Sequence, residues 1–197
     1  MTSTTVRGPY AKTKQQRETI IQAALDYFGQ YGYHGASMRE IARDVGLSQA
    51  GLLHHFKTKA ELLTATLESR DALTGTAIDA AVARSRSPLA GIVAIVEDNA
   101  AHRHLVQMFT VVSAEATDES HPAHQYFVDR SRRVIDHMRT ELAAAVQQGV
   151  ARADLDVDSA ARQCQAMIYG LQVQWLLDPR ADMVALFRAF LEDLTRP

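Results

Sequence analysis

The chain has 197 residues, a formal net charge of −2 and an apolar fraction of 47%, which is enough for a packed core of one or two domains. Its single cysteine excludes an intramolecular disulfide and suits a reducing compartment. The sequence shows neither a run of about 20 apolar residues nor a basic start followed by an apolar segment, so we expect no membrane span, no signal peptide and a cytoplasmic location.

The N-terminal segment lacks apolar periodicity until residue 12. We expect residues 1–11 to form a flexible arm, in which Arg7 is a candidate for a contact with a minor groove or a phosphate. The alternative is a tail that contacts nothing. Apolar residues then recur at spacings of three and four over residues 12–31, which predicts an amphipathic helix. Gly32 marks its predicted end.

Residues 37–56 have the pattern of two short helices joined by a tight turn. Ser37 and Glu40 form a capping box at the start of the first helix. Gly46 stands where a left-handed residue commonly ends a helix, and Ser48 is placed to cap the second helix. Such a pair is a device that places one helix in a DNA groove.

Gly51 lies inside the second of these helices, where glycine costs roughly 1 kcal/mol relative to alanine. A residue without a side chain lets the backbone of a groove-bound helix come close to a base or a phosphate. The alternative is that Gly51 relieves crowding between the helices.

Charge divides unevenly along the chain. Residues 1–59 carry eight Lys/Arg and four Asp/Glu, a balance of +4, which leaves −6 for the remainder. A basic N-terminal region on an acidic body would keep DNA at one end of the molecule. An ordinary solvated surface is the alternative.

From residue 58 the pattern changes to long helices. Thr58 and Glu61 form another capping box, and the helix that follows is predicted to reach about residue 83. No strand pattern appears, so the expected fold is all-α, with about nine helices. The further helical runs are predicted at residues 87–96, 105–112, 121–149, 154–177 and 183–194.

The first third of the chain carries a recognisable pattern at nearly every diagnostic position. Its residues are Ile21, Gln22, Ala23, Ala24, Leu25, Phe28, Tyr31, Gly32, Tyr33, Ser37, Met38, Arg39, Glu40, Ile41, Ala42, Val45, Gly46, Leu47, Ser48, Leu52, His55, Phe56, Lys59, Leu62 and Leu63. With this pattern the chain resembles the TetR family of transcriptional regulators. Residues 121–124 and 170–179 resemble a subset of the same family. One position departs: the family usually has a Tyr whose hydroxyl meets a phosphate where this chain has Leu53, and His54 and His55 are candidates to replace that contact.

The resemblance implies a helix-turn-helix DNA-binding domain over residues 1–57 and a helical ligand-binding and dimerisation domain over residues 58–197. It implies a ligand-responsive regulator, most simply a repressor, that binds a palindromic operator in double-stranded DNA as a homodimer. A small-molecule effector then releases the DNA. Activation of transcription is the alternative mode.

Candidate DNA contacts follow from side-chain chemistry and from the resemblance. The Gln49 amide can pair bidentately with adenine, and the resemblance places Arg39 within reach of a guanine from the preceding helix. Phosphate contacts set register rather than sequence, and for them we favour Ser37, Ser48, His55, Thr58 and Lys59. The full set of candidates is Ser37, Arg39, Ser48, Gln49, Gly51, His54, His55, Thr58 and Lys59.

The middle helices hold candidates for an effector pocket. These side chains predict a mostly apolar pocket with a few polar anchors. No cluster of carboxylates or arginines in the sequence points to a particular effector, which is expected to be largely apolar. The alternative for each residue is ordinary core packing. The candidates are Met108, Phe109, Val112, Tyr126, Met138, Gln172 and Trp175.

The last two predicted helices carry more apolar surface than one face of a body requires. The resemblance implies a dimer through a four-helix bundle, with two helices from each chain. Two recognition helices on a two-fold axis read half-sites about 34–36 Å apart, or a multiple of that spacing. The alternative is that these stripes are internal core. The predicted interface residues are Cys164, Ile168, Leu171, Trp175, Phe187, Phe190, Leu191 and Leu194.

An enzyme or a metal protein is the main alternative function class. His102 and His104 diverge on a helix, and His121 and His124 share a side without a further Cys or Glu-x-x-His partner. No phosphate-binding glycine loop, nucleophile elbow or carboxylate pair appears. We therefore expect no enzymatic activity, no metal and no cofactor. A third interpretation is a DNA-binding head on a partner-recruiting body that is indifferent to small molecules.

Overall fold

The computed structural model describes the backbone of residues 9–196 and the side chains of residues 13–196. No strand occurs in this part of the chain, which confirms the all-α prediction. The nine helices that this part forms are α1 (Pro9–Gly35), α2 (Met38–Asp44), α3 (Gln49–His55), α4 (Lys59–Arg84), α5 (Ala90–Ala101), α6 (Arg103–Glu115), α7 (His124–Gln147), α8 (Val157–Leu177) and α9 (Met183–Thr195).

Helix α1 differs from the prediction at both ends. It begins at Pro9, inside the segment predicted as a flexible arm, because proline is well suited to the first turn of a helix. Residues 1–8, with Arg7 among them, lie outside the described residues. Gly32 kinks the helix rather than ending it, since its φ of 69° and ψ of −177° fall in a region that glycine alone adopts readily. Helical turns continue to Gly35.

Side chains cap the starts of α2, α3 and α4 as predicted. The hydroxyl oxygens of Ser37, Ser48 and Thr58 accept hydrogen bonds from the backbone N–H groups three residues later, at 3.5, 3.0 and 3.0 Å respectively. The Glu61 carboxylate, which a capping box would direct back to Thr58, instead accepts from the N–H of Lys57 at 2.8 Å.

Three helices begin later than the sequence pattern indicates. Helix α8 begins at Val157, where the Asp156 side chain caps it. Helix α5 begins at Ala90 and α7 at His124, and no side chain caps either first turn. Ser87 and His121, which mark the predicted starts, instead accept hydrogen bonds from backbone N–H groups in the turns that precede these helices. These turns, rather than caps, therefore set where α5 and α7 begin.

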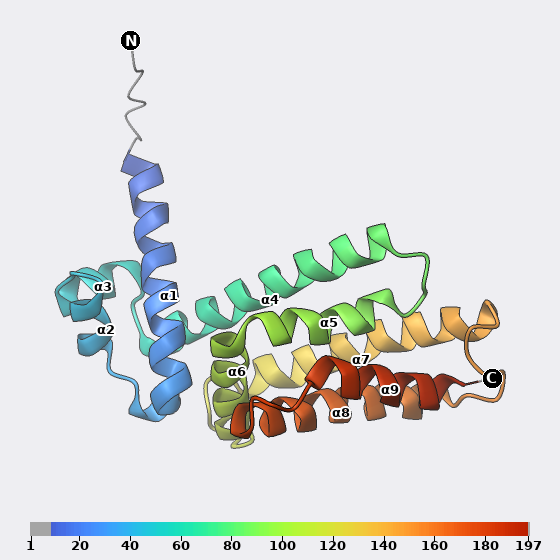
Figure 1. Ribbon diagram of the computed structural model, residues 1–197. Helices are drawn as coiled ribbons and strands as arrows, with labels where there is room; N and C mark the ends of the chain where they lie inside the picture. Colours follow the sequence, from blue (N-terminus) through green and yellow to red (C-terminus); the bar gives the residue numbers. More distant parts are fainter. Residues whose placement is uncertain (1–8, 197) are drawn as a thin grey trace, which may run out of the picture.

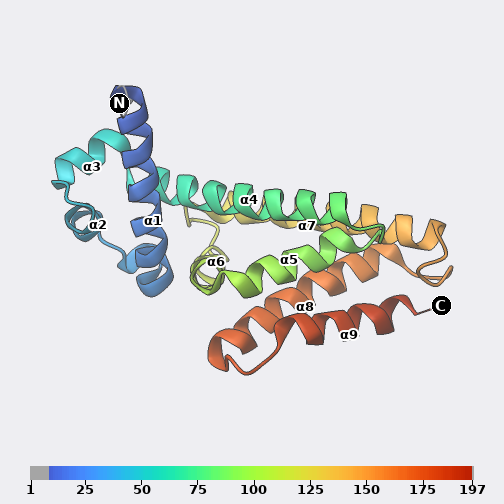
Figure 2. The same ribbon diagram turned by 45° about the horizontal axis from the view of Figure 1, so that its top comes forward.

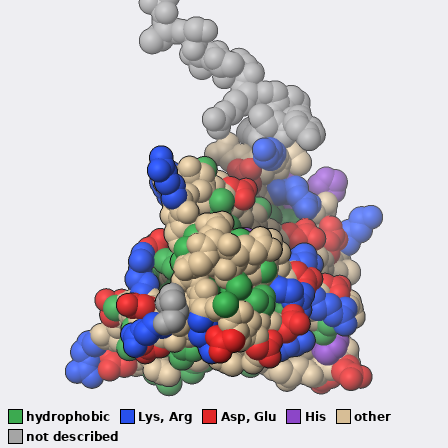
Figure 3. Space-filling view, turned by 90° about the vertical axis from the view of Figure 1, so that its right-hand side faces the viewer, with side chains coloured by type: hydrophobic (Ala, Val, Ile, Leu, Met, Phe, Trp, Pro, Cys, Tyr) green, Lys and Arg blue, Asp and Glu red, His purple; other side chains and the backbone are tan. Residues whose placement is uncertain are grey.

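Helices α1–α3 form a head at one end of the molecule, and α4 leads from this head into a body made of α4–α9 (Figure 1). Helix α6 lies crosswise between α1 and the other body helices, and α8 and α9 form the side of the body away from α4 (Figure 2). Acidic and basic side chains are interspersed over the end of the body opposite the head (Figure 3). None of the described helices combines the length and the hydropathy needed to cross a bilayer.

Two apolar clusters hold the described chain together. The first joins α1–α3 to the start of α4 and to α6, through side chains such as Phe28, Phe56, Leu63 and Met108. The second lies between α5, α7, α8 and α9. Each fully buried Leu or Phe contributes roughly 1.5–3 kcal/mol. The core of the head therefore extends across the predicted boundary at residue 57 and includes side chains of α4 and α6.

Candidate DNA-binding face and effector cavity

Helices α2 and α3 meet at Gly46, whose φ of 71° confirms the predicted left-handed residue. The side chains beside this turn line one surface hollow, which brings four of the DNA-contact candidates together. Arg43 adds a second guanidinium there and was not predicted, although its spacing of four from Arg39 puts both on one face of α2. The lining consists of Ser37, Arg39, Glu40, Arg43, Leu47, Ser48 and Gln49.

The three capping hydroxyls remain available to DNA. A hydroxyl whose oxygen accepts a helix N–H still has its own proton to donate. Ser48 and Thr58 are exposed and Ser37 is half-buried. The phosphate contacts predicted for these residues are therefore compatible with their capping roles.

Gly51 has room for a side chain within the protein. A Cβ built on it would lie 3.4 Å from Ser48 Oγ and 3.7 Å from Leu47, which is ordinary van der Waals contact. Crowding between the helices therefore does not account for the glycine. Close approach of a DNA backbone or base edge is the interpretation that we favour.

The variant Gly51→Ala is expected to separate stability from DNA binding. Alanine should raise the free energy of unfolding by up to about 1 kcal/mol, because nothing in the fold opposes the methyl group. The same methyl group should weaken DNA binding, as measured by fluorescence anisotropy beside a thermal unfolding curve. Ala50→Gly at the exposed neighbouring position is the reverse control and should lower stability. Unchanged DNA affinity in Gly51→Ala would exclude the groove role.

The end of α3 is tied to α1 by Arg17. Its guanidinium donates a hydrogen bond to the carbonyl of His55 and lies 4.1 Å from the centre of the Phe56 ring. Burial, His54 and Arg17 all lower the pKa of His55, so this imidazole is neutral at pH 7 and keeps one N–H donor. Leu53, at the position of the usual Tyr, is exposed and offers DNA only an apolar contact.

Lys59 is occupied within the protein. Its ammonium donates to the carbonyls of Ala36 and His34, at 3.0 and 3.3 Å, and lies 4.6 Å from the centre of the Tyr33 ring. Partial burial lowers the pKa of Lys59, and Glu115 offsets part of this effect. The side chain thus joins the end of α1 to the start of α4. A phosphate contact from Lys59 stays a prediction and would compete with these bonds.

Glu115 connects α6 to the kink in α1. Its carboxylate accepts the N–H of Tyr33, the first residue after the kink, at 2.6 Å. A Cβ at Gly32 would lie 2.3 Å from the same carboxylate, so a side chain at the kink would have to displace the Glu115 carboxylate and disturb its bond to Tyr33. The bend of α1 and the position of α6 therefore depend on each other.

An enclosed cavity of about 50 Å³ lies within the body, with walls from α4, α5, α6, α7 and α8. Three of the predicted pocket residues, Phe109, Met138 and Gln172, line it. Tyr126 stands beside it, where its hydroxyl donates to Asp71 at 2.6 Å. The cavity is thus the best candidate for the effector pocket.

The other pocket candidates lie elsewhere, which corrects their assignment. Met108 and Val112 belong to the apolar cluster of the head, because they project from the side of α6 that faces α1. Trp175 packs on the outer part of the body cluster, with the guanidinium of Arg103 5.1 Å from its ring centre.

Much of the cavity wall is polar and was not predicted. Arg70 and Thr74 continue the buried face of α4 that begins with Leu63 and Leu67, at spacings of three and four. These polar residues interrupt an otherwise apolar helix face, and this interruption was the sequence signal that could have identified them. The polar residues missed are Arg70, Thr74, Asn99, Arg130 and Gln165.

A charge network forms one side of this wall. Asp71 accepts hydrogen bonds from Arg130 at 2.8 Å and from Arg70 at 3.3 Å. Burial alone would raise the pKa of Asp71, but the Arg130 guanidinium, the hydrogen bonds from Arg130 and Tyr126, and Arg70 together hold that pKa below its ordinary value. Burial and repulsion from Arg130 lower the pKa of Arg70 to about 10, so it is charged at pH 7. The expectation that no arginine cluster marks the pocket is therefore wrong.

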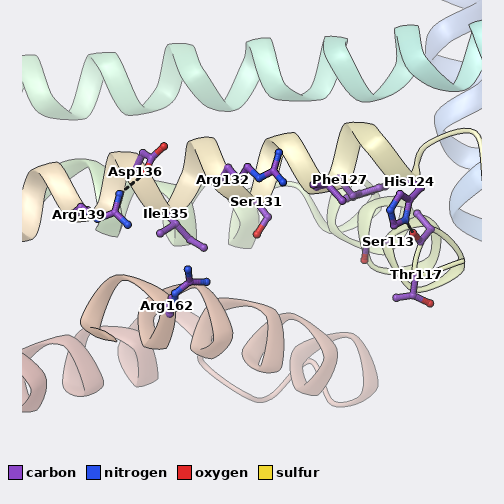
Figure 4. Close-up of a pocket in the computed structure, with 12 residues that line it drawn as sticks. Ser113, Thr117, His124, Phe127, Ser131, Arg132, Ile135, Asp136, Arg139 and Arg162 are labelled. Atoms are coloured by element: carbon purple, nitrogen blue, oxygen red, sulfur yellow. Dashed lines mark hydrogen bonds and ion pairs between the residues drawn. The ribbon is translucent and has the colours of Figure 1, made fainter. Parts of the chain in front are cut away.

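A second concavity is an open groove on the surface, lined by residues of α6, α7 and α8. Figure 4 shows Arg162 pointing from α8 toward Ile135 on α7, and Arg139 paired with Asp136. The groove shares no lining residue with the enclosed cavity. Because it is open to water, its arginines are hydrated, and we rate it below the cavity as an effector site.

The predicted dimer-interface residues lie within the core of a single chain. Trp175, Phe190 and Leu194 are partly buried against the body cluster, and the other five are buried inside it, namely Cys164, Ile168, Leu171, Phe187 and Leu191. These apolar stripes face inward, so the interface assignment is corrected in favour of the internal core. The outer faces of α8 and α9 carry instead Ala166, Gly170, Val173, Leu177, Ala185, Leu186 and Ala189.

Neither a metal site nor a reactive thiol is found among the described residues. Within the described residues, no group of three His, Cys, Asp or Glu side chains is placed to hold a metal ion. Cys164 is fully buried, and burial raises the pKa of its thiol to about 12. The thiol therefore stays protonated at neutral pH and is unreactive.

Both parts of the chain match known protein families. Residues 20–66 match the bacterial regulatory proteins of the tetR family. Residues 88–196, more than half of the chain, match the C-terminal region of the BetI-type transcriptional repressors. The chain belongs to the TetR family. Within this family α2 and α3 are the helix-turn-helix unit, and the body is the C-terminal ligand-binding domain.

Relatives in the TetR family match along most of the chain. The transcriptional regulator SrpR of Pseudomonas putida is 29% identical over 171 residues, which are 86% of this chain and 79% of that protein. The regulator BetI of Brucella canis is 27% identical over 179 residues, 90% of this chain and 88% of that protein. These relatives are transcriptional regulators rather than enzymes.

Solved structures share the same fold. A transcriptional regulator from Saccharomonospora viridis in complex with choline has a TM-score of 0.78 and 25% identity, and the match covers 91% of this chain and 95% of that chain. AibR in complex with isovaleryl coenzyme A and operator DNA has a TM-score of 0.73 and 22% identity, with 92% and 99% covered. The ligands of these two proteins differ in charge and size, so the fold alone does not define an effector.

Proposed function

We propose that this chain is a cytoplasmic repressor that binds a palindromic DNA operator as a homodimer and leaves it when a small molecule enters the body. The hollow between α2 and α3 carries the DNA-binding part of this proposal. Arg39, Arg43 and Gln49 surround it and are exposed. Arginine and glutamine are the side chains that read guanine and adenine edges in the major groove.

The outer faces of α8 and α9 support the dimer. Val173, Leu177 and Leu186 are 43, 82 and 48% exposed, an apolar surface that a second copy would cover. A Cβ at Gly170 would meet no atom of the described residues within 4 Å, so this position leaves room for a neighbouring helix. Two copies related by a two-fold axis would hold their heads at one fixed separation.

The position of α6 supports release by an effector. Phe109 lines the cavity, whereas Met108 and Val112 on the other side of α6 pack within the core of the head. A ligand that displaces Phe109 would shift α6 against α1 and change the separation of the two heads. It must bind this shifted state more tightly than the DNA-bound state, since otherwise the equilibrium does not move.

Selection of bound duplexes from a random pool tests the proposal. The expected result is a palindrome whose half-sites lie one helical turn, or a multiple of it, apart. A purified chain that stays monomeric and prefers no duplex would contradict both the dimer and the operator.

The variant Gln49→Ala is expected to relax base choice at one position of each half-site, with a loss of about 1–3 kcal/mol in discrimination. The amide pairs with a base edge, so affinity for random duplexes should change little. Binding to the selected operator and to its single-base variants measures the effect. Gln147→Ala, exposed at the far end of α7, is the matched control. Equal losses on operator and random DNA would assign Gln49 to a phosphate.

A further inference from the structure

Two buried arginines and one aromatic ring form the inner wall of the effector cavity. The guanidinium carbon of Arg70 lies 4.5 Å from the centre of the Phe109 ring, and that of Arg130 lies 4.4 Å from it. The relative exposure of Arg70 is 2% and that of Arg130 is 7%. Two cations are thus held around one ring, away from water, which is costly unless anions compensate them.

The protein supplies too little negative charge at this wall. Asp71 contacts both arginines, and it also lies 3.8 Å from the guanidinium of Arg133 on the surface. Asp98, on α5, accepts from Thr74 at 2.9 Å and lies 3.2 Å from His102, so its carboxylate has other partners. Among the described residues, Asp71 is the one carboxylate in ion-pair contact with Arg70 or Arg130, so the two buried guanidiniums share a single anion.

Two hydrogen-bond donors at the cavity have no acceptor. Arg70 donates to the amide oxygen of Asn99 at 3.0 Å, which fixes the two side chains against each other. The Nε of Arg70 and the Nδ2 of Asn99 are buried and have no partner among the described residues. Both residues line the cavity and Asn99 is 2% exposed. An unpaired buried donor is destabilising, so this pair favours an oxygen acceptor between them.

The rest of the cavity wall combines apolar side chains with the polar Thr74, Gln165 and Gln172, and part of this wall is shared with a hollow that opens at the surface. Ile78, Ile95 and Val134 line the enclosed cavity and also a surface hollow of about 290 Å³. Residues of α4, α5 and α7 line this hollow, Arg133 and His137 among them. The cavity volume of about 50 Å³ is enough for a small polar group such as a carboxylate. An apolar chain attached to that group would extend along the shared wall.

We propose that the effector is a small carboxylic acid with a short apolar chain, bound by its carboxylate to Arg70 and Asn99. Each carboxylate oxygen can accept one of the unpaired N–H groups, and the negative charge offsets the excess of guanidinium. The same charge disfavours a quaternary ammonium such as choline. This inference rests on the proposed function, because it names the chemistry of the molecule that releases the protein from its operator.

Calorimetric titration of the full chain tests the inference with straight-chain carboxylates from acetate to octanoate, each paired with its uncharged amide, and with choline. We expect at least one carboxylate to bind at least about tenfold more tightly than its amide, with choline not binding. If no carboxylate is preferred over its amide, or if choline binds instead, the inference is overturned. Operator binding is measured in the same samples. If the protein binds its operator but prefers no carboxylate, the proposed function stands and only the inference about the effector fails.

Two variants locate the carboxylate. Arg70→Met removes the charge at similar length and should abolish binding of the preferred carboxylate, whereas Arg84→Met, at the exposed end of the same helix, should leave it nearly unchanged. A second variant, Asn99→Asp, keeps the test decisive even where Arg70→Met does not fold. It places a carboxylate of the protein itself beside Arg70, where the carboxylate of the ligand would bind. It should keep the helical circular dichroism, raise the melting temperature and block the added carboxylate. Carboxylate binding of ordinary strength in Asn99→Asp would place the ligand elsewhere.

Discussion

The variant Asp71→Asn is expected to lose about 3 kcal/mol of the free energy of unfolding. Breaking a buried ion pair by removing one partner costs roughly 3–5 kcal/mol, because the remaining charge is left uncompensated. The lower end of that range applies since the Asp71 side chain is 26% exposed. Without its carboxylate, Arg70 and Arg130 repel each other inside the body, and Tyr126 loses a charged acceptor. Urea denaturation measures the difference.

The stability difference between wild type and Asp71→Asn should change with pH in a defined direction. The folded-state pKa of Asp71 is below its ordinary value, so its charge contributes stability that is fully present above an unfolded pKa near 4. That contribution disappears as the pH falls through the folded pKa, and the gap between wild type and Asp71→Asn should narrow with it. Asp79→Asn removes the same charge from an exposed site on α4 and should leave stability nearly unchanged. If the difference in free energy of unfolding stays constant down to acid pH, the ionised carboxylate of Asp71 is not what stabilises the fold.

The DNA-binding part was predictable because its signals are local. Ser37, Ser48 and Thr58 each cap a helix through a bond to a residue three positions away, and Gly46 sets a turn by its own φ. Local bonds of this kind leave a trace in a short window of sequence. Arg43 was missed because a second exposed arginine on a short helix is common and carries no distinctive pattern.

The cavity was predictable only in part, because its chemistry is assembled from distant segments. Arg70 and Arg130 are 60 residues apart and meet only after α4 and α7 pack. A hydrophobic pattern shows which helix face is buried but not which neighbour covers it. For the same reason the stripes of α8 and α9 were assigned to a partner chain, although the body of the same chain covers them.

The exposed apolar residues on α8 and α9 lead to the second large effect, the loss of the proposed dimer in Val173→Arg. Val173 is 43% exposed on the outer face of α8, and two-fold symmetry would bring two such arginines to one interface. Burying unpaired charges there should raise the dissociation constant of the dimer at least about 100-fold. Sedimentation equilibrium measures the shift. Affinity for the palindromic operator should fall with it, because a monomer contacts one half-site only.

Val82→Arg is the matched control for this experiment. Val82 is 48% exposed on α4, so the same substitution adds the same charge at similar exposure outside α8 and α9. It should leave the chain dimeric and bound to its operator. If Val82→Arg dissociates the dimer and Val173→Arg does not, the interface lies on the α4 side of the body. The separation of the two heads would then be set by a different interface. A shift of α6 could no longer change that separation by moving each head relative to an interface formed by α8 and α9.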